Sequence, residues 1–193
     1  IAACEYGGDK GIFGYGYNGG ENSMTNLVSN AGVVSADVTG VGTARNNLAA
    51  CSYGDDKGIF GYGISGSVRS MTNLVSNTGV VATDVTGVGT ARSQLAATEY
   101  GYDKGIFGYG LGPVSMTNLV TNVGVVGTDV TGVGSARLYL AACTFGDKGL
   151  FGYGAIWPAY VSMTNIVSNA GVVATDVTGV GTGRTGPAAC SYN

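Results

Sequence analysis

The chain has 193 residues, of which 36 are glycine and 11% are charged, and its formal net charge is -3. This balance gives no electrostatic reason to expect nucleic acid as a partner, and no apolar run reaches the ~18 residues that a membrane-spanning helix needs. Histidine is absent, which excludes Ser-His-Asp and Cys-His nucleophile systems. The sequence therefore predicts a protein that is not an enzyme and carries no cofactor.

Three phrases recur in the same order along the chain and divide it into units. Phe-Gly-Tyr-Gly is followed each time by Ser-Met-Thr-Asn and then by Asp-Val-Thr-Gly-Val-Gly. The second phrase begins at Ser23, Ser70, Ser115 and Ser162. Such self-similarity is the signature of a repeat architecture. We divide the chain into units 1–47, 48–94, 95–139 and 140–186, followed by residues 187–193, which open a further unit.

Taken in chain order, the residues of one unit predict strands and no helix, as the second unit shows. It opens with a short run of small and apolar residues, after which Gly54 and Asp55 mark a turn. Ile59 and Phe60 then belong to a segment of types that fit a pleated, half-buried surface. We expect its four strands at residues 48–53, 57–62, 71–76 and 80–85.

Four strands in about 47 residues have the size and content of one blade of a β-propeller, a small sheet that runs from an inner to an outer edge. A β-solenoid and a stack of hairpins along a fibre are the alternatives. A solenoid rung is usually shorter and needs no meander of four strands. We therefore predict an all-β fold, a single β-propeller domain of four-stranded blades with one extra inner strand at residues 187–193.

Part of the repeat resembles a known family. Arginine and a small-residue strand at 92–97 precede an apolar strand with closing glycines at 103–110, and this order is similar to that of the kelch repeat. The resemblance extends over all four units. It implies that the Leu-Ala-Ala-Cys segment is the innermost strand, nearest the central channel of a propeller.

The two ends of the chain carry the same phrase. Residues 1–4 read Ile-Ala-Ala-Cys and residues 187–190 read Pro-Ala-Ala-Cys. In a closed ring of four blades these segments would compete for one position. Either the ring has more blades than this chain supplies, or one end frays, or the extra strand passes to a neighbouring subunit.

The cysteines occupy one position of the repeat, where the third unit has Thr98. A position that accepts cysteine or threonine indicates a small packed side chain. Disulfides would need Cα atoms within about 7 Å, which is feasible only near the axis. A zinc site is weaker still, because there is no Cys-x-x-Cys pair, so we expect no metal. The cysteines are Cys4, Cys51, Cys143 and Cys190.

Each unit also carries an aspartate and, eight residues later, an arginine. Four equivalent aspartates indicate a structural role, because a catalytic carboxylate pair needs two unlike environments. The arginines have two interpretations: a clamp within or between blades, or a ring of guanidinium groups on one face that holds anionic ligands. The residues are Asp37, Asp84, Asp129 and Asp176, with Arg45, Arg92, Arg137 and Arg184.

The loop after Phe-Gly-Tyr-Gly differs between units, whereas the strands barely change. Aromatic and basic residues on variable loops of a rigid scaffold are a usual recognition surface, although a surface loop can also drift freely. Trp157 is the only tryptophan of the chain. The binding candidates on these loops are Tyr17, Arg69, Trp157 and Tyr160.

The sequence is compatible with three functions that belong to different classes. The first is a structural or interaction module in a surface or virion fibre or a similar extracellular assembly, with a protein partner or self-association. The second is a lectin-like propeller with repeated glycan sites. The third is an enzyme on a propeller scaffold, which needs a buried carboxylate that breaks the repeat. Glu5, Glu21 and Glu99 break the repeat, and we expect all three in solvated turns.

Overall fold

The computed structural model describes residues 1–191, and this part of the chain is all-β and contains no helix. Each unit forms one antiparallel three-stranded sheet. The sheets are β1 (Ala2–Tyr6), β2 (Lys10–Tyr17) and β3 (Glu21–Val28); β4 (Ala49–Tyr53), β5 (Lys57–Gly61) and β8 (Thr72–Val75); β9 (Ala96–Tyr100), β10 (Lys104–Gly108) and β11 (Thr117–Val120); and β12 (Ala141–Phe145), β13 (Lys148–Gly152) and β16 (Thr164–Val167).

Two small hairpins are added to this pattern. They are β6 (Ile64–Ser65) with β7 (Ser67–Val68) in the second unit, and β14 (Ala155–Ile156) with β15 (Ala159–Tyr160) in the fourth. Within the described residues no sheet closes on itself, and no helix is long and apolar enough to cross a membrane.

The pairing register is the same in every unit, as the sequence repeat requires. Cys4 pairs with Ile12, Cys51 with Ile59, and Thr98 with Ile106. At the first turn, Gly54 and Asp55 have φ angles of 59° and 67°. Glycine and aspartate tolerate this left-handed conformation better than other residues, which explains why they occupy the turn.

The fourth predicted strand, at 80–85 in the second unit, is not a strand. That segment meets β8 only at isolated bridges, Thr72 with Val85 and Val75 with Val81. Between these bridges, the side-chain amide of Asn73 donates to the carbonyl of Ala82 at 3.0 Å. The units predicted with four strands therefore have three, because a side chain provides contacts there in place of a continuous backbone ladder.

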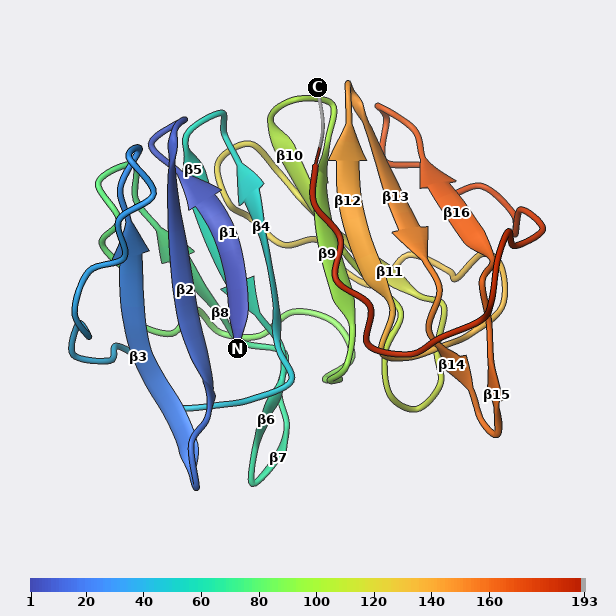
Figure 1. The fold of residues 1–193 in the computed structure, drawn as a ribbon, viewed down its shortest axis with the longest axis horizontal. Helices are drawn as coiled ribbons and strands as arrows, with labels where there is room; N and C mark the ends of the chain where they lie inside the picture. The colour runs from blue at the N-terminus through green and yellow to red at the C-terminus, as the bar shows by residue number, and fades with distance from the viewer. Residues whose placement is uncertain (192–193) are drawn as a thin grey trace.

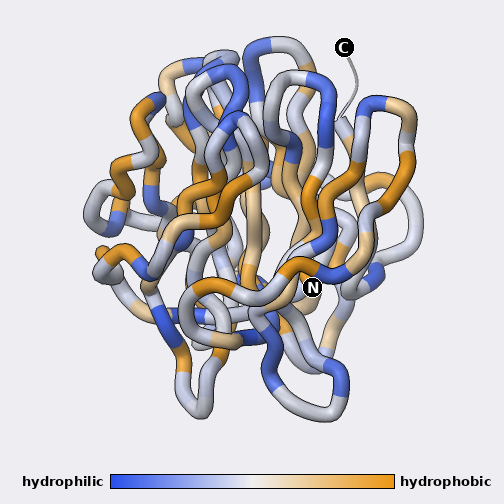
Figure 2. Tube along the Cα trace, turned by 90° about the vertical axis from the view of Figure 1, so that its left-hand side faces the viewer, coloured by the Kyte–Doolittle hydropathy of each residue, from blue (hydrophilic) through white to orange (hydrophobic). Residues whose placement is uncertain are grey.

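The four sheets follow one another in space as they do in the sequence (Figure 1). The first strands of the units lie side by side in the order β1, β4, β9 and β12. Hydrophobic stretches run mainly along the strands, and hydrophilic ones lie mainly in the turns (Figure 2). The units are thus stacked in a row, and the buried apolar residues of the strands lie between neighbouring units.

Each hydrophobic core cluster combines residues of two consecutive units. Between the first and second units, Tyr6, Ile12 and Tyr15 pack with Leu48 and Phe60. The Phe-Gly-Tyr-Gly motif forms this contact, because the ring of Phe60 lies against Gly14, where an added Cβ would come within 2.8 Å of the ring. The glycine is therefore the seat for the phenylalanine of the next unit.

The segment after the last full unit lies beside β12. The backbone N–H of Thr144 donates to Oγ of Ser191 at 3.2 Å. The extra strand predicted at 187–193 is not formed by residues 187–191, and residues 192 and 193 lie outside the described part of the chain.

Candidate functional site

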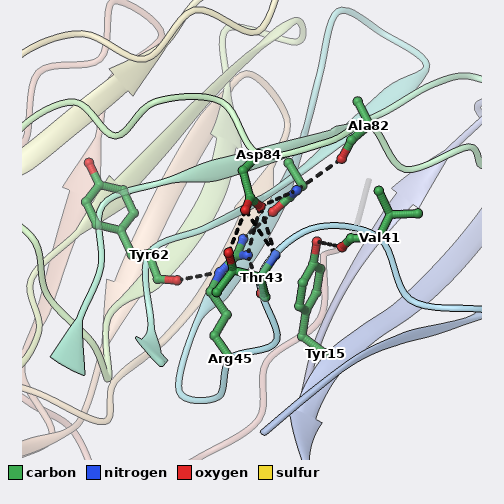
Figure 3. A network of polar contacts seen from close by, with 8 residues as sticks. Tyr15, Val41, Thr43, Arg45, Tyr62, Ala82 and Asp84 are labelled. Carbon is green, nitrogen blue, oxygen red and sulfur yellow. Dashed lines mark hydrogen bonds and ion pairs between the residues drawn. The ribbon is translucent and has the colours of Figure 1, made fainter. Parts of the chain in front are cut away.

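An arginine at the end of each of the first three units enters the following unit, and Figure 3 shows this contact for Arg45. Nε of Arg45 donates to the carbonyl of Tyr62 at 2.8 Å, and Nη2 donates to Oδ1 of Asn73 at 2.6 Å. Nη1 donates to the carbonyl of Thr43 at 3.1 Å. The guanidinium also lies 4.4 Å from the ring centroid of Tyr15, a cation–π contact within its own unit.

An aspartate of the following unit completes this junction. Asp84 accepts hydrogen bonds from N and Oγ1 of Thr43 at 3.0 and 2.6 Å, and from Nδ2 of Asn73 at 2.9 Å. Its carboxylate lies 3.8 Å from Nη1 of Arg45. Burial acts to raise the pKa of Asp84, but the hydrogen bonds from Thr43 and Asn73 outweigh it and the pKa is lowered. The junction therefore holds the carboxylate in its charged form.

The tyrosine of Phe-Gly-Tyr-Gly is held in an unusual backbone conformation at the junction. Tyr62 has a φ of 65° although it is fully buried, and Tyr15, Tyr109 and Tyr153 have φ angles of 61° to 64°. Such a conformation is costly for a bulky residue and persists only where its surroundings hold it. Here the carbonyl of Tyr62 is bonded by the arginine of the preceding unit.

The same junction is built three times. Arg92 binds Asn118 at 2.7 Å in the third unit, and Arg137 binds Asn165 at 2.7 Å in the fourth. Together with Arg45, these side chains are at most 1% exposed. The clamp interpretation therefore describes them. They cannot form the exposed ring for anionic ligands, because the neighbouring unit occupies their hydrogen-bond donors. Arg184 is exposed and lies over the ring of Tyr153 at 4.6 Å.

The variable loops lie along one edge of the molecule, where Figure 1 shows the β2–β3 turn, the β6–β7 hairpin and the β14–β15 hairpin projecting downward. Trp157 is 56% exposed and Tyr160 51%, and their ring centroids are 5.7 Å apart in an edge-to-face arrangement. Tyr17 is 69% exposed at the end of β2. Arg69 is partly buried and donates to the carbonyl of Ser65 at 2.9 Å. The loops thus present aromatic side chains to solvent.

A concave region lies between the first strands of the units. It has a volume of about 530 Å³, and its lining includes Cys4, Glu5, Thr98, Glu99 and Cys143. Burial raises the pKa of Glu99 to about 7, and the charges of Glu5, Asp55 and Asp103 contribute further. No group of three or more Cys, Asp or Glu in residues 1–191 is placed to hold a metal ion.

The expected turn positions are wrong for all three acids that break the repeat, because each lies on a strand and Glu21 is the first residue of β3. Glu5 lies on β1 and is exposed, whereas Glu99 lies on β9 and is only partly exposed. The third acid, Glu21, is exposed and accepts a hydrogen bond from N of Gly66 at 3.1 Å. The alternation of side chains along residues 2–6 could have placed Glu5 on a strand. Glu5 lies on the opposite face of β1 from Cys4 and Tyr6.

The cysteines are free; Cys51 is buried, Cys4 and Cys143 are partly buried, and Cys190 is exposed, so the expected packed position does not describe Cys190. Sγ of Cys4 and Cys51 lie against Gly58 and Gly105 of the next unit, where an added Cβ would come within 2.5 and 2.7 Å of them. Burial raises the pKa of the Cys4 thiol to about 12, and that of Cys51 also rises. These two thiols therefore serve packing and are poor nucleophiles.

No protein-family model matches the chain, and no curated protein matches it.

Proposed function

We propose that the chain is a non-catalytic scaffold, a run of propeller-type blades that presents its variable hairpins to a protein partner. The observation that carries the proposal is that the repeated and the variable side chains of each unit occupy different places. The repeated side chains are consumed in the junctions, as Arg45 and Asn73 show, whereas the most exposed aromatic pair, Trp157 and Tyr160, lies on a hairpin that differs between units. Rigid scaffolds with variable loops are a usual way to build binding surfaces.

The propeller topology is part of this proposal. The kelch-like order of the repeat and the lateral sequence of β1, β4, β9 and β12 support an inner position for these strands. The segment at 80–85 would take the outer place of a blade, held by its isolated bridges to β8. The low charge of the chain fits a surface or virion fibre or a similar extracellular assembly.

The hairpin surface can be tested with a double variant, Trp157→Ala with Tyr160→Ala. The purified chain is applied to an array of displayed extracellular proteins and to a glycan array. The proposal expects binding to a protein that the double variant loses at least tenfold, because aromatic anchors carry much of the binding energy of an interface.

Tyr102→Ala is the matched control, since this tyrosine is 67% exposed but lies in the β9–β10 turn, away from the hairpins. It should bind as the parent chain does. Equal binding by the double variant would contradict the proposal that the hairpin surface binds the partner. Binding to glycans alone, lost in the double variant, would favour the lectin-like function instead.

A further inference from the structure

The outer faces of the first and fourth units are the two unmatched halves of the junction that the chain builds three times. Each internal junction joins a donor half, made of a tyrosine, a Val-Gly-Thr or Val-Gly-Ser segment and an arginine, to an acceptor half, made of an asparagine, an aspartate and a phenylalanine. The fourth unit presents a donor half with no following unit in this structure. The first unit presents an acceptor half with no preceding one.

The donor half of the fourth unit is already formed. The hydroxyl of Tyr153 donates to the carbonyl of Val180 at 3.3 Å, as that of Tyr15 donates to Val41 at 3.1 Å. N of Gly154 bonds the carbonyl of Arg184 at 3.0 Å, as N of Gly63 bonds that of Arg92 in the second unit. The guanidinium of Arg184 is stacked on its tyrosine like the buried arginines. The side chain of Arg184 therefore has the same position relative to its own unit as the three buried arginines have relative to theirs.

The acceptor half of the first unit is formed in the same way. Nδ2 of Asn26 donates to Oδ1 of Asp37 at 2.8 Å, just as Asn73 donates to Asp84 in the second unit. In the internal junctions, this pair receives the arginine and the threonine of the preceding unit. Here Asp37 is exposed and Asn26 is partly exposed, whereas Asn73, Asn118 and Asn165 of the internal junctions are fully buried.

The apolar contacts of the junction are also split between the two faces. Phe60, Phe107 and Phe151 are fully buried against glycines of the preceding units, whereas Phe13 is 39% exposed. Gly152 is the matching seat on the fourth unit, and an added Cβ there would meet only its own unit, 3.4 Å from Cγ2 of Thr164. The protruding ring and the open seat lie on opposite ends of the row of units.

We propose that a second copy of this chain docks head to tail, with the first unit of one copy seated on the fourth unit of the other. Arg184 would donate to Oδ1 of Asn26 of the incoming copy, and Asp37 of that copy would accept from Thr182. Phe13 would fill the seat at Gly152. The charges are complementary, and the contact continues the interface already built between the units. A heterologous contact of this kind produces a ring if its rotation closes and a filament if it does not.

The segment 187–191 borders the same docking face. Its phrase matches the first strand of a unit, and Ser191 accepts from Thr144 of β12. The incoming β1 therefore displaces this segment. One exposed hydrogen bond contributes about 1 kcal/mol at most, so the segment weakens docking without preventing it.

The test uses two variants that each block one face, Asp37→Arg and Arg184→Glu. Both side chains are exposed, so both variants should keep the fold, which circular dichroism checks. Sedimentation velocity over a concentration series should show species larger than 19.3 kDa for the parent chain and only the single chain for either variant alone. A 1:1 mixture of the variants should associate at least to a dimer, because each retains one working face.

Lys57→Glu is the control, since it also reverses an exposed charge but lies in the second unit. It should associate like the parent chain. A parent chain that stays at the mass of one chain at high concentration overturns the proposal. So does association that survives Arg184→Glu, which would indicate that two like faces meet. The outcome does not depend on the hairpin surface.

Discussion

Nη2 of Arg45 donates a 2.6 Å hydrogen bond to Oδ1 of Asn73, and this bond joins the end of the first unit to strand β8 of the second. The guanidinium is fully buried, yet its three nitrogens all have acceptors. A buried charge is tolerated only when it is paired and hydrogen-bonded in this way. The repeated phrases are therefore alike because each supplies one part of a junction.

Replacing a buried arginine should destabilise the fold strongly. Arg92→Met leaves Oδ1 of Asn118 and the carbonyl of Tyr109 without their donor, and it removes the positive charge 3.9 Å from Asp129. We expect a loss of roughly 3 kcal/mol in the free energy of unfolding, measured by urea denaturation. Arg184→Met is the matched control, and in the single chain it should change stability by about 0.5 kcal/mol or less. Equal effects of the two variants would contradict the clamp.

The glycine seats give a second matched pair. In Gly61→Ala the new methyl would lie 2.6 Å from Cζ of Phe107, so the sheets must move apart. Overpacking of this kind costs about 1–3 kcal/mol and should lower the thermal midpoint. Gly152→Ala occupies the same repeat position without a neighbouring ring, and at low protein concentration it should unfold close to the parent temperature. A midpoint for Gly61→Ala equal to that of Gly152→Ala would show that the phenylalanine does not need the glycine.

Stability should fall as the pH rises through neutrality. The pKa of Glu99 is raised to about 7 in the folded chain, above its ordinary value of 4.5 in the unfolded chain. The folded state therefore binds this proton more tightly, so its stabilising effect is complete below about pH 4.5 and is lost as the pH rises to 7 and above. Solvent screening of this partly exposed group limits the effect to about 1 kcal/mol.

Glu99→Gln should reduce that pH dependence and stabilise the fold at pH 8. Thermal unfolding at pH 5 and pH 8 measures both effects. Glu21→Gln, at the exposed start of β3, serves as the comparison and should leave the dependence unchanged. A steeper dependence in Glu99→Gln would contradict the raised pKa.

The cysteines should differ in their reaction with iodoacetamide. Cys190 is exposed and should be alkylated within minutes in the native protein. Cys51 is buried with a raised pKa, so it should react only after unfolding in urea. Peptide mass spectrometry at pH 8 reads each site separately. Rapid labelling of Cys51 in the native state would show that the second and third units separate readily.

The sequence repeat was enough to predict the all-β fold, the units and the first three strands of each unit. It also predicted a fourth strand that is not formed, because the competition between the Asn73 amide and a backbone ladder is invisible in the pattern of apolar residues. The arginines were ambiguous for a related reason: spacing places them at a turn but does not say which unit receives them. Glu99 was predicted in a turn because turn-forming residues follow it closely in the sequence. The two-residue alternation of β9, to which it belongs, received too little weight.

Each junction is made from the end of one unit and the middle of the next, so every unit carries one donor half and one acceptor half. Duplicating or deleting a whole unit in a gene would leave all remaining junctions chemically unchanged. The number of units can therefore drift by recombination with little effect on local stability. A hairpin such as β14–β15 can diverge in one copy while its neighbours preserve the scaffold.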